Sequence, residues 1–190
     1  FSCGLAPVSI PAASARSVLQ DTVLDGTGLV TLDGGGTTRM LSVPSSFELA
    51  TPTLTVQRMT FTGGSGEGVA GDDTERGGGA IWLRGGSLHV VACSFTDNHA
   101  PASGQDVAGG AIYDVGSGHV TIVGSSFSGN GASNGGAIGI LHADLAIADT
   151  EIAENAATGS GGNPGNGGNG GGIYIDGVGQ DVSLCGVRLA

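Results

Sequence analysis

The 190-residue chain contains no lysine, and only 12% of its residues are charged. Six arginines stand against 17 acidic residues, which gives a formal net charge of −11 at pH 7. A surface of this sign repels nucleic-acid phosphates and anionic lipid headgroups. Nucleic acid and anionic membrane surfaces are therefore not expected as partners.

Long apolar runs are also missing. No stretch of about 18 apolar residues occurs, so no transmembrane helix is predicted. No segment repeats apolar residues at i, i+3, i+4 and i+7 over several turns, which argues against helices. Glycine accounts for 39 residues without the three-residue period of collagen, and apolar residues make up 39% of the chain, too many for a disordered linker. The composition predicts a folded, almost entirely β protein with many tight turns.

Cysteine is scarce, and its spacing argues against two common sites. Cys3, Cys93 and Cys185 include no CxxC pair, so neither a zinc site nor a redox motif is predicted. Their odd number leaves the disulfide pairing open. The sequence begins at Phe1 rather than methionine, which favours a processed product or a fragment without its signal peptide. We therefore expect a protein that is exported from the cell.

One spacing recurs five times along the chain. Two apolar residues separated by one position are followed, seven positions after the first, by a large apolar residue. The units are Leu54, Val56 and Phe61; Leu88, Val90 and Phe95; Val120, Ile122 and Phe127; Leu145, Ile147 and Ile152; and Val182, Leu184 and Leu189. The starts of these units are 34, 32, 25 and 37 residues apart. A fixed spacing inside each unit and a variable one between units indicates a solenoid whose turns carry loops of different length.

Two more motifs accompany the units. Gly-Gly-Ala-Ile occurs at 78–81, 109–112 and 135–138, with the variant Gly-Gly-Ile at 171–173. Glycine can turn a corner with φ > 0, and the small residue after it lets neighbouring turns approach. Asn98, Asn130 and Asn155 each follow the last apolar residue of a unit by three positions. Asparagine suits a second corner, because it tolerates the left-handed region and its amide can bond to the turns above and below.

Three short strands per turn, each with inward apolar residues, predict a right-handed parallel β-helix of triangular section with about five to six rungs. Residues 1–20 are expected to form an entry or cap segment. Residues 21–190 are expected to form the β-helix, incomplete or uncapped at its C-terminus. Like side chains should stack as a structural ladder made of Phe61, Phe95, Phe127 and Ile152 inside the coil and of Asn98, Asn130 and Asn155 at a corner.

Long insertions are expected at a single corner, in the loops Thr62–Gly77, His99–Ala108, Gly131–Asn134 and Ala156–Gly170. The first two loops carry Glu67, Asp72, Asp73, Glu75 and Asp106. Carboxylate oxygens are hard ligands that suit Ca²⁺, so these residues are a candidate calcium site. A solvated polar loop is the alternative. No other cofactor is predicted.

Aromatic residues at alternate positions form a second candidate site. Trp82, Tyr113 and Tyr174 alternate with inward isoleucines, so they should form an outward row that could stack on sugar rings. Ordinary outward sheet residues are the alternative. Arg84 and Asp114 lie close to this row in sequence and are the candidate catalytic residues if the chain is an enzyme. No Ser-His-Asp, HExxH or phosphate-loop pattern occurs.

The pairing of GGAI with FxxN resembles the repeat of chlamydial polymorphic outer-membrane proteins. The match comprises 78–81 with 95–98, 109–112 with 127–130, and 135–138 with a degenerate form at 152–155, and the resemblance covers residues 54–190. It implies a right-handed parallel β-helix on an exported or cell-surface protein, in that family often the passenger of an autotransporter adhesin. This chain has few repeats, and its sequence contains neither a recognisable anchor nor a C-terminal membrane barrel.

Two functions follow as hypotheses. The first is a non-catalytic, extracellular or cell-surface module for adhesion, structure or assembly, with a protein or polysaccharide partner and with end-to-end or lateral self-association. The second is a carbohydrate-active enzyme, a polysaccharide lyase or hydrolase of the parallel β-helix type.

Overall fold

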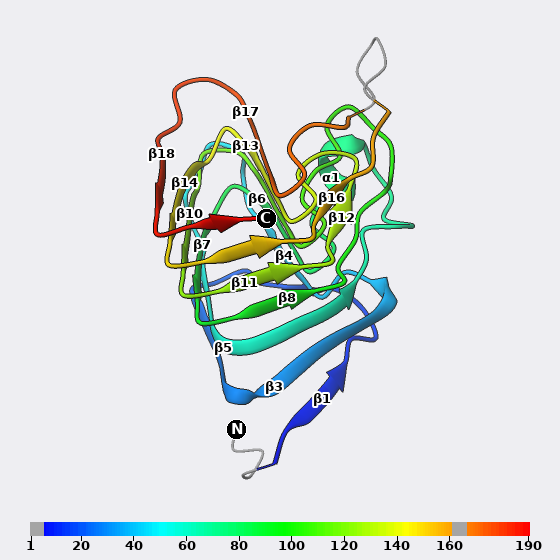
Figure 1. The fold of residues 1–190 in the computed structure, drawn as a ribbon. Helices are drawn as coiled ribbons and strands as arrows, with labels where there is room; N and C mark the ends of the chain where they lie inside the picture. Colours follow the sequence, from blue (N-terminus) through cyan, green and yellow to red (C-terminus); the bar gives the residue numbers. More distant parts are fainter. Residues whose placement is uncertain (1–5, 161–166) are drawn as a thin grey trace.

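The computed structural model describes residues 6–160 and 167–190. The protein is all-β with long parallel sheets, one of which curls strongly (Figure 1). Its one helix among the described residues is the four-residue α1 (Asp73–Arg76). No helix in the described part of the chain is long and apolar enough to cross a membrane.

The largest sheet has eleven strands, and its long strands β3 and β5 run through both of its arms. One arm contains short strands that pair onto the first part of β5, and the other contains strands that pair onto its last part. The strands of this sheet are β1 (Val8–Pro11), β3 (Thr22–Thr38), β5 (Thr53–Gly64), β7 (Ser87–Val91), β8 (Ser94–Thr96), β10 (His119–Val123), β11 (Ser126–Ser128), β14 (Asp144–Ala148), β15 (Glu151–Ala153), β18 (Val182–Cys185) and β19 (Arg188–Leu189).

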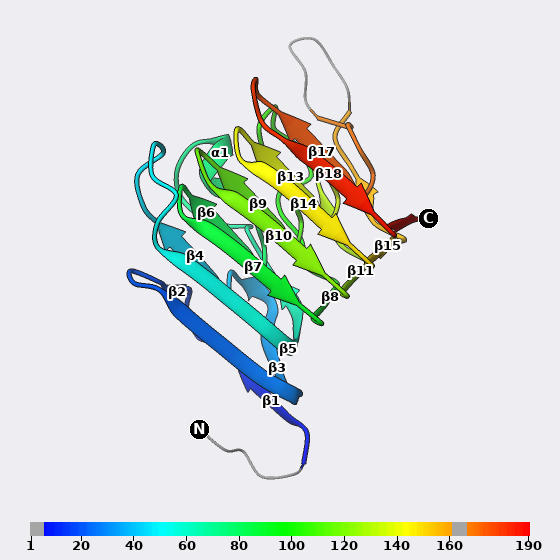
Figure 2. The same ribbon diagram turned by 90° about the vertical axis from the view of Figure 1, so that its left-hand side faces the viewer.

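A six-stranded parallel sheet lies opposite the curled one (Figure 2). Its strands are β2 (Arg16–Ser17), β4 (Leu41–Pro44), β6 (Ile81–Arg84), β9 (Ile112–Val115), β13 (Ile138–Leu141) and β17 (Ile173–Asp176). The two-stranded sheet of β12 (Gly131–Ala132) and β16 (Ala156–Ala157) completes the described strands. The chain thus passes from the six-stranded sheet through both arms of the curled sheet and returns, and we call each such pass a turn.

The register between turns follows the predicted seven-residue units. Leu54 lies beside Leu88, Leu88 beside Val120, Val120 beside Leu145, and Leu145 beside Val182. The third members of the units pair in the same way, from Phe61 through Phe95, Phe127 and Ile152 to Leu189. These alignments confirm the predicted columns of like residues.

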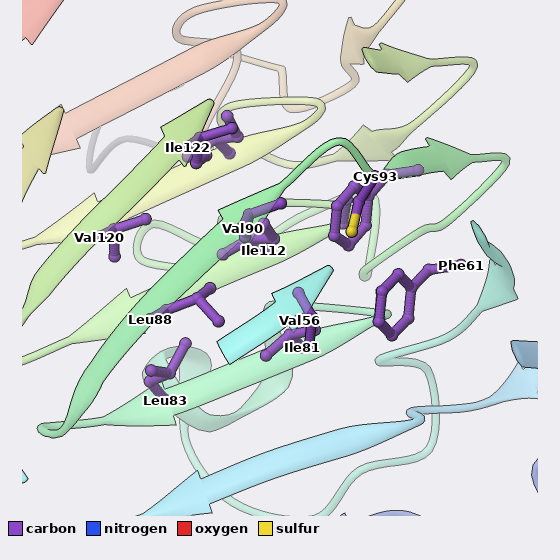
Figure 3. Close-up of a cluster of buried hydrophobic side chains, with 14 of the residues drawn as sticks. Val56, Phe61, Ile81, Leu83, Leu88, Val90, Cys93, Ile112, Val120 and Ile122 are labelled. Atoms are coloured by element: carbon purple, nitrogen blue, oxygen red, sulfur yellow. The ribbon is translucent and has the colours of Figure 1, made fainter. Parts of the chain in front are cut away.

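The columns fill the space between the sheets. The rings of Phe61, Phe95 and Phe127 stack almost parallel, with centroids 4.8 and 4.7 Å apart, and all three side chains are fully buried. Figure 3 shows how residues of both sheets meet in this core, including Leu83, Leu88 and Ile112. Stacking works because parallel strands lie about 4.8 Å apart, which is also a comfortable spacing for offset aromatic rings.

The predicted asparagine ladder is present at the corner after β8, β11 and β15. Nδ2 of Asn98 donates to Oδ1 of Asn130 at 3.0 Å, and Nδ2 of Asn130 donates to Oδ1 of Asn155 at 2.8 Å. Each Nδ2 also donates to a main-chain carbonyl of the preceding turn. The reason given for asparagine at the corner was partly wrong, because the left-handed residue is its predecessor. Asp97 and Glu154 have φ of 54° and 57°.

Glycine serves the other corner as predicted. Gly109 has a φ of 64°, and a Cβ on Gly110 would lie 2.3 Å from the carbonyl oxygen of Gly136 in the next turn. All the predicted insertions leave the curled sheet and enter the six-stranded one, so they share one corner of the fold. The last of them includes residues 161–166, which lie outside the described part of the chain.

The N-terminal segment is part of the sheets. Within residues 1–20, β1 pairs with β3 and β2 pairs with β4. Of the cysteines, Cys93 is buried and Cys185 is exposed, and neither forms a disulfide among the described residues. Cys3 lies outside the described residues.

We predict that the asparagine ladder is a large contributor to stability. Replacing Asn130 by Ala removes the acceptor of the Asn98 main-chain and side-chain N–H groups and leaves buried polar groups unpaired. The free energy of unfolding in urea should fall by about 2–4 kcal/mol. Ser128→Ala, on the outer face of the same turn, should change it by less than about 0.5 kcal/mol. Equal effects of the two changes would contradict a structural ladder.

Candidate functional site

The predicted aromatic row points away from the central core but is not open to solvent. Trp82 and Tyr113 lie side by side on β6 and β9 and are 7% and 0% exposed. They form a second buried cluster with Ala108 and Val115, and Tyr174 packs on its edge. The prediction that Trp82 and Tyr113 contact a glycan was therefore wrong, because inserted loops cover both rings.

Hydrogen bonds tie these rings to the loops. Nε1 of Trp82 donates to the carbonyl oxygen of Thr74 at 2.8 Å, and the Tyr113 hydroxyl donates to that of Asp106 at 2.7 Å. Burial raises the pKa of Tyr113 above its ordinary value. Tyr174 is partly buried, and its hydroxyl donates to Oδ2 of Asp176 at 2.8 Å. The inserted loops therefore pack against the outer aromatic residues.

The five candidate calcium ligands lie in these covering loops. Asp72 is the N-cap of α1: its Oδ1 accepts from the Thr74 N–H at 2.9 Å, and Oε2 of Glu75 accepts from the Asp72 N–H at 3.2 Å. The Thr74 hydroxyl also donates to Oδ1 of Asp72 at 2.6 Å, and this bond lowers the pKa of Asp72. Asp73 faces Arg76 at 3.7 Å. These carboxylates thus bond to other residues of their own loop.

Asp106 belongs to the neighbouring loop, and the fifth candidate, Glu67, is exposed. Partial burial, together with the nearby charges of Asp73 and Asp176, raises the pKa of Asp106. Among residues 6–160 and 167–190, no group of three or more His, Cys, Asp or Glu side chains could hold a metal ion. The structure therefore does not assemble the five carboxylates into a cation site, and calcium binding stays a prediction without geometric support.

A buried arginine that the sequence did not single out anchors the first loop. Arg39 is 7% exposed, and its guanidinium donates to the carbonyl oxygens of Gly77 and Gly78 at 2.8 and 3.1 Å and also to that of Glu75. It lies over the Trp82 ring, 5.4 Å from the centroid. Burial lowers the pKa of Arg39 to about 10. No repeat or motif marks this residue, because its partners are backbone carbonyls of a nonrepeating loop.

Arg84 and Asp114 do not form a catalytic pair. Arg84 pairs in register with Val115, whereas Asp114 pairs with Leu83, so their side chains emerge on opposite faces of the sheet. Asp114 is fully buried. The structure therefore does not bring the two candidate catalytic residues together.

The structure instead brings polar residues together in a groove on the outer surface, which we call the corner groove. Two adjoining hollows of about 380 and 390 Å³ share His119 and Asp144. The first hollow lies over β10, β14 and β18, which face the viewer in Figure 2, and the second lies where β9, β13 and β17 lead into those strands. The corner groove is lined by Phe47, Ser117, Gly118, His119, Val120, Thr121, His142, Asp144, Leu145, Ala146, Val178, Gly179, Asp181, Val182 and Ser183.

A contact between a histidine and an aspartate lies at the centre of the corner groove. Nδ1 of His119 lies 3.0 Å from Oδ2 of Asp144, and Oδ1 of Asp144 accepts from the Asp181 N–H at 2.8 Å. The ring of Phe47 meets His142 edge-on, with centroids 5.5 Å apart. The arrangement presents carboxylates and imidazoles beside an apolar wall, and such groups can bind hydroxyl-rich or basic ligands.

A sequence signal for this groove exists. His119, Asp144 and Asp181 each come directly before the first apolar residue of a seven-residue unit, so equal register places them side by side in neighbouring turns. The seven-residue spacing was applied only to apolar residues, so it did not single out these polar ones.

Comparison with family models, with curated proteins and with solved structures gives no match to this chain.

The single tryptophan offers a test of how the first loop is held. We predict that Arg39→Ala releases the loop from Trp82, so that the tryptophan emission shifts to the red and becomes open to quenching by acrylamide. Arg58→Ala, which removes an exposed ion pair with Asp25, should leave the emission unchanged. An unshifted spectrum in Arg39→Ala would show that the loop packs without the guanidinium.

Proposed function

We propose that the chain is a right-handed, three-sided parallel β-helix of an exported protein, and that it works as a non-catalytic assembly module at or outside the cell surface. The proposed partner is a second copy of the chain, which docks on the edge formed by β17, β18 and β19. The resemblance to the polymorphic outer-membrane protein repeat supports the exported location.

The observation that carries this proposal is the exposure of apolar residues on β18 and β19, which are outermost strands of the curled sheet. Leu145 and Ile147 on β14 are 1% and 2% exposed, whereas their column partners Val182 and Leu184 on β18 are 44% and 48% exposed. Leu189 on β19 is 59% exposed. Apolar side chains on an outermost strand of a sheet are a template for further strand pairing.

The opposite end of one column supports a copy of the same chain as the occupant. The phenylalanine column begins at Ile10, which pairs with Leu32 and is 42% exposed, and it ends at Leu189. This column therefore has an exposed apolar residue at each end. Parallel strand pairing between two molecules would join the Ile10 end of one to the Leu189 end of the other. Contacts between unlike surfaces are heterologous and lead to open-ended chains of molecules.

We predict that association depends on concentration and on the edge residues. Leu189→Lys places a charge in the docking edge and should lower the measured molar mass to that of the monomer in analytical ultracentrifugation. Val123→Lys is the matched control, because Val123 is apolar and 37% exposed on the side of β10, and it should associate like the parent protein. A parent protein that stays monomeric at millimolar concentration would overturn the proposal.

A second candidate function, binding or cleavage of a polysaccharide, is favoured by the corner groove. Asp144 on β14 and Asp181 just before β18 lie in neighbouring turns and line the same hollow, so the groove holds two carboxylates, and glycosidases use a pair of carboxylates. Since the groove is lined by carboxylates, its ligand should be neutral or basic.

We predict binding of neutral oligosaccharides on a glycan array, reduced at least tenfold by Asp144→Asn. Release of reducing ends that is lost in Asp181→Asn would show cleavage, and binding without such release would show a binding module. Thr55→Ala, on the outer face of β5, is the control because Thr55 lies outside the groove. An array without a bound neutral or basic glycan would exclude this second function.

A further inference from the structure

An ionisable side chain occupies a position that its neighbours fill with aliphatic groups. Asp114 lies between Leu83 on β6 and Ile140 on β13, which are both fully buried. Its own exposure is 0%, and neither carboxyl oxygen has a hydrogen-bond partner among the described residues. A carboxylate without a partner is very costly in such surroundings, whereas a neutral carboxylic acid costs far less.

The elements packed around Asp114 offer no compensating charge. The adjacent strands supply Leu83 and Ile140, and the following turn supplies Gly118, where a Cβ would lie 3.0 Å from Oδ2 of Asp114. The titratable groups nearest in the sequence and in register are Arg84, His119 and His142. Arg84 is in register with Val115 on the outer face, and both histidines line the corner groove outside the core.

We propose that Asp114 is a proton-dependent lock: its neutral carboxyl holds the turn Gly116–Gly118 and the middle of the stack in place, and release of the proton as the pH rises loosens both. This inference stands independently of the proposed assembly and of glycan binding, because it concerns the interior of a single molecule.

The sign of the effect follows from the direction of the shift. Burial raises the pKa of Asp114 well above its ordinary value, while the unfolded chain keeps an ordinary pKa of about 4. Between these two values the folded protein holds a proton that the unfolded chain has lost. Stability from this group is therefore complete below about pH 4 and falls as the pH rises toward the folded-state pKa, by up to about tenfold in the unfolding equilibrium constant per pH unit.

Ordinary salt-bridged carboxyls act in the opposite direction. The Arg58 guanidinium lowers the pKa of Asp25 to about 2, so this exposed pair loses its small contribution only in strong acid. His119 lies beside Asp144, whose main-chain N–H bonds to the turn Gly116–Gly118, so His119 is the neighbouring ionisable side chain with which Asp114 has to be compared. The experiment must therefore separate Asp114 from His119.

The turn that follows Asp114 is the place where loosening should be seen. The Ser117 N–H donates to the Phe47 carbonyl oxygen at 2.7 Å, and the Gly118 carbonyl oxygen accepts from the Asp144 N–H at 3.0 Å. Both bonds connect the turn to walls of the corner groove. A carboxylate beneath Gly118 would draw water toward it and strain these bonds, so the exchange of the Ser117 and Asp144 amide protons should accelerate.

The test is urea unfolding of the full chain between about pH 4 and 8. Parent protein and His119→Gln should both lose stability as the pH rises, whereas Asp114→Asn and Asp114→Leu should lose that slope. Leucine reproduces the aliphatic neighbours in the column, so it serves if the asparagine variant folds poorly. Hydrogen exchange at Ser117 should speed up with pH beyond the intrinsic rate only in the two proteins that keep Asp114.

Two results would overturn the proposal. One is an equal pH slope in the parent protein and in Asp114→Leu. The other is an infrared spectrum at pH 6 without a protonated-carboxyl band that disappears in Asp114→Asn.

Discussion

Parallel strands that keep one register bring the same kind of side chain together in turn after turn, and the rest of this structure depends on that constraint. The spacing of about 4.8 Å between strands matches what stacked rings and bonded amides need. Phe61, Phe95 and Phe127 therefore stack with nearly parallel planes, and the asparagines at the corner bond to one another. A helix or an antiparallel sheet made of the same residues would not align them in this way.

The same constraint separates the parts of the chain that can vary from those that cannot. Most residues inside a turn lie between similar residues of the turns above and below, so their size and polarity are constrained, and Asp114 between Leu83 and Ile140 is an exception. Residues of the inserted loops face no repeat, and they build a second core of their own on Trp82 and Tyr113. Arg39 joins the two systems, since it starts beside β4 and ends on loop carbonyls. The loops are thus packed parts of the protein and not freely exposed insertions.

The sequence was sufficient to predict the strand register and the columns. The interval between Leu88 and Phe95 recurs in every unit, and buried apolar residues must lie beside other apolar residues. It was also sufficient for the corner where the loops enter. The sequence predicted that Trp82 and Tyr113 point away from the core. It did not predict that the inserted loops cover them, because the packing of these loops follows no repeat. It failed for Asp114 because the residue replaces an aliphatic member of a column. His119 and Asp144 could have been paired from the repeat spacing alone.

The asparagine ladder has a direction. Asn98 donates its amide hydrogen toward Asn130, and Asn130 donates toward Asn155, so the three amide dipoles point the same way along the rod. Hydrogen bonds in such a series polarise one another, and each one strengthens when another is added. A third asparagine therefore stabilises the corner more than a second one does, and the rigidity of this edge grows faster than the number of asparagines.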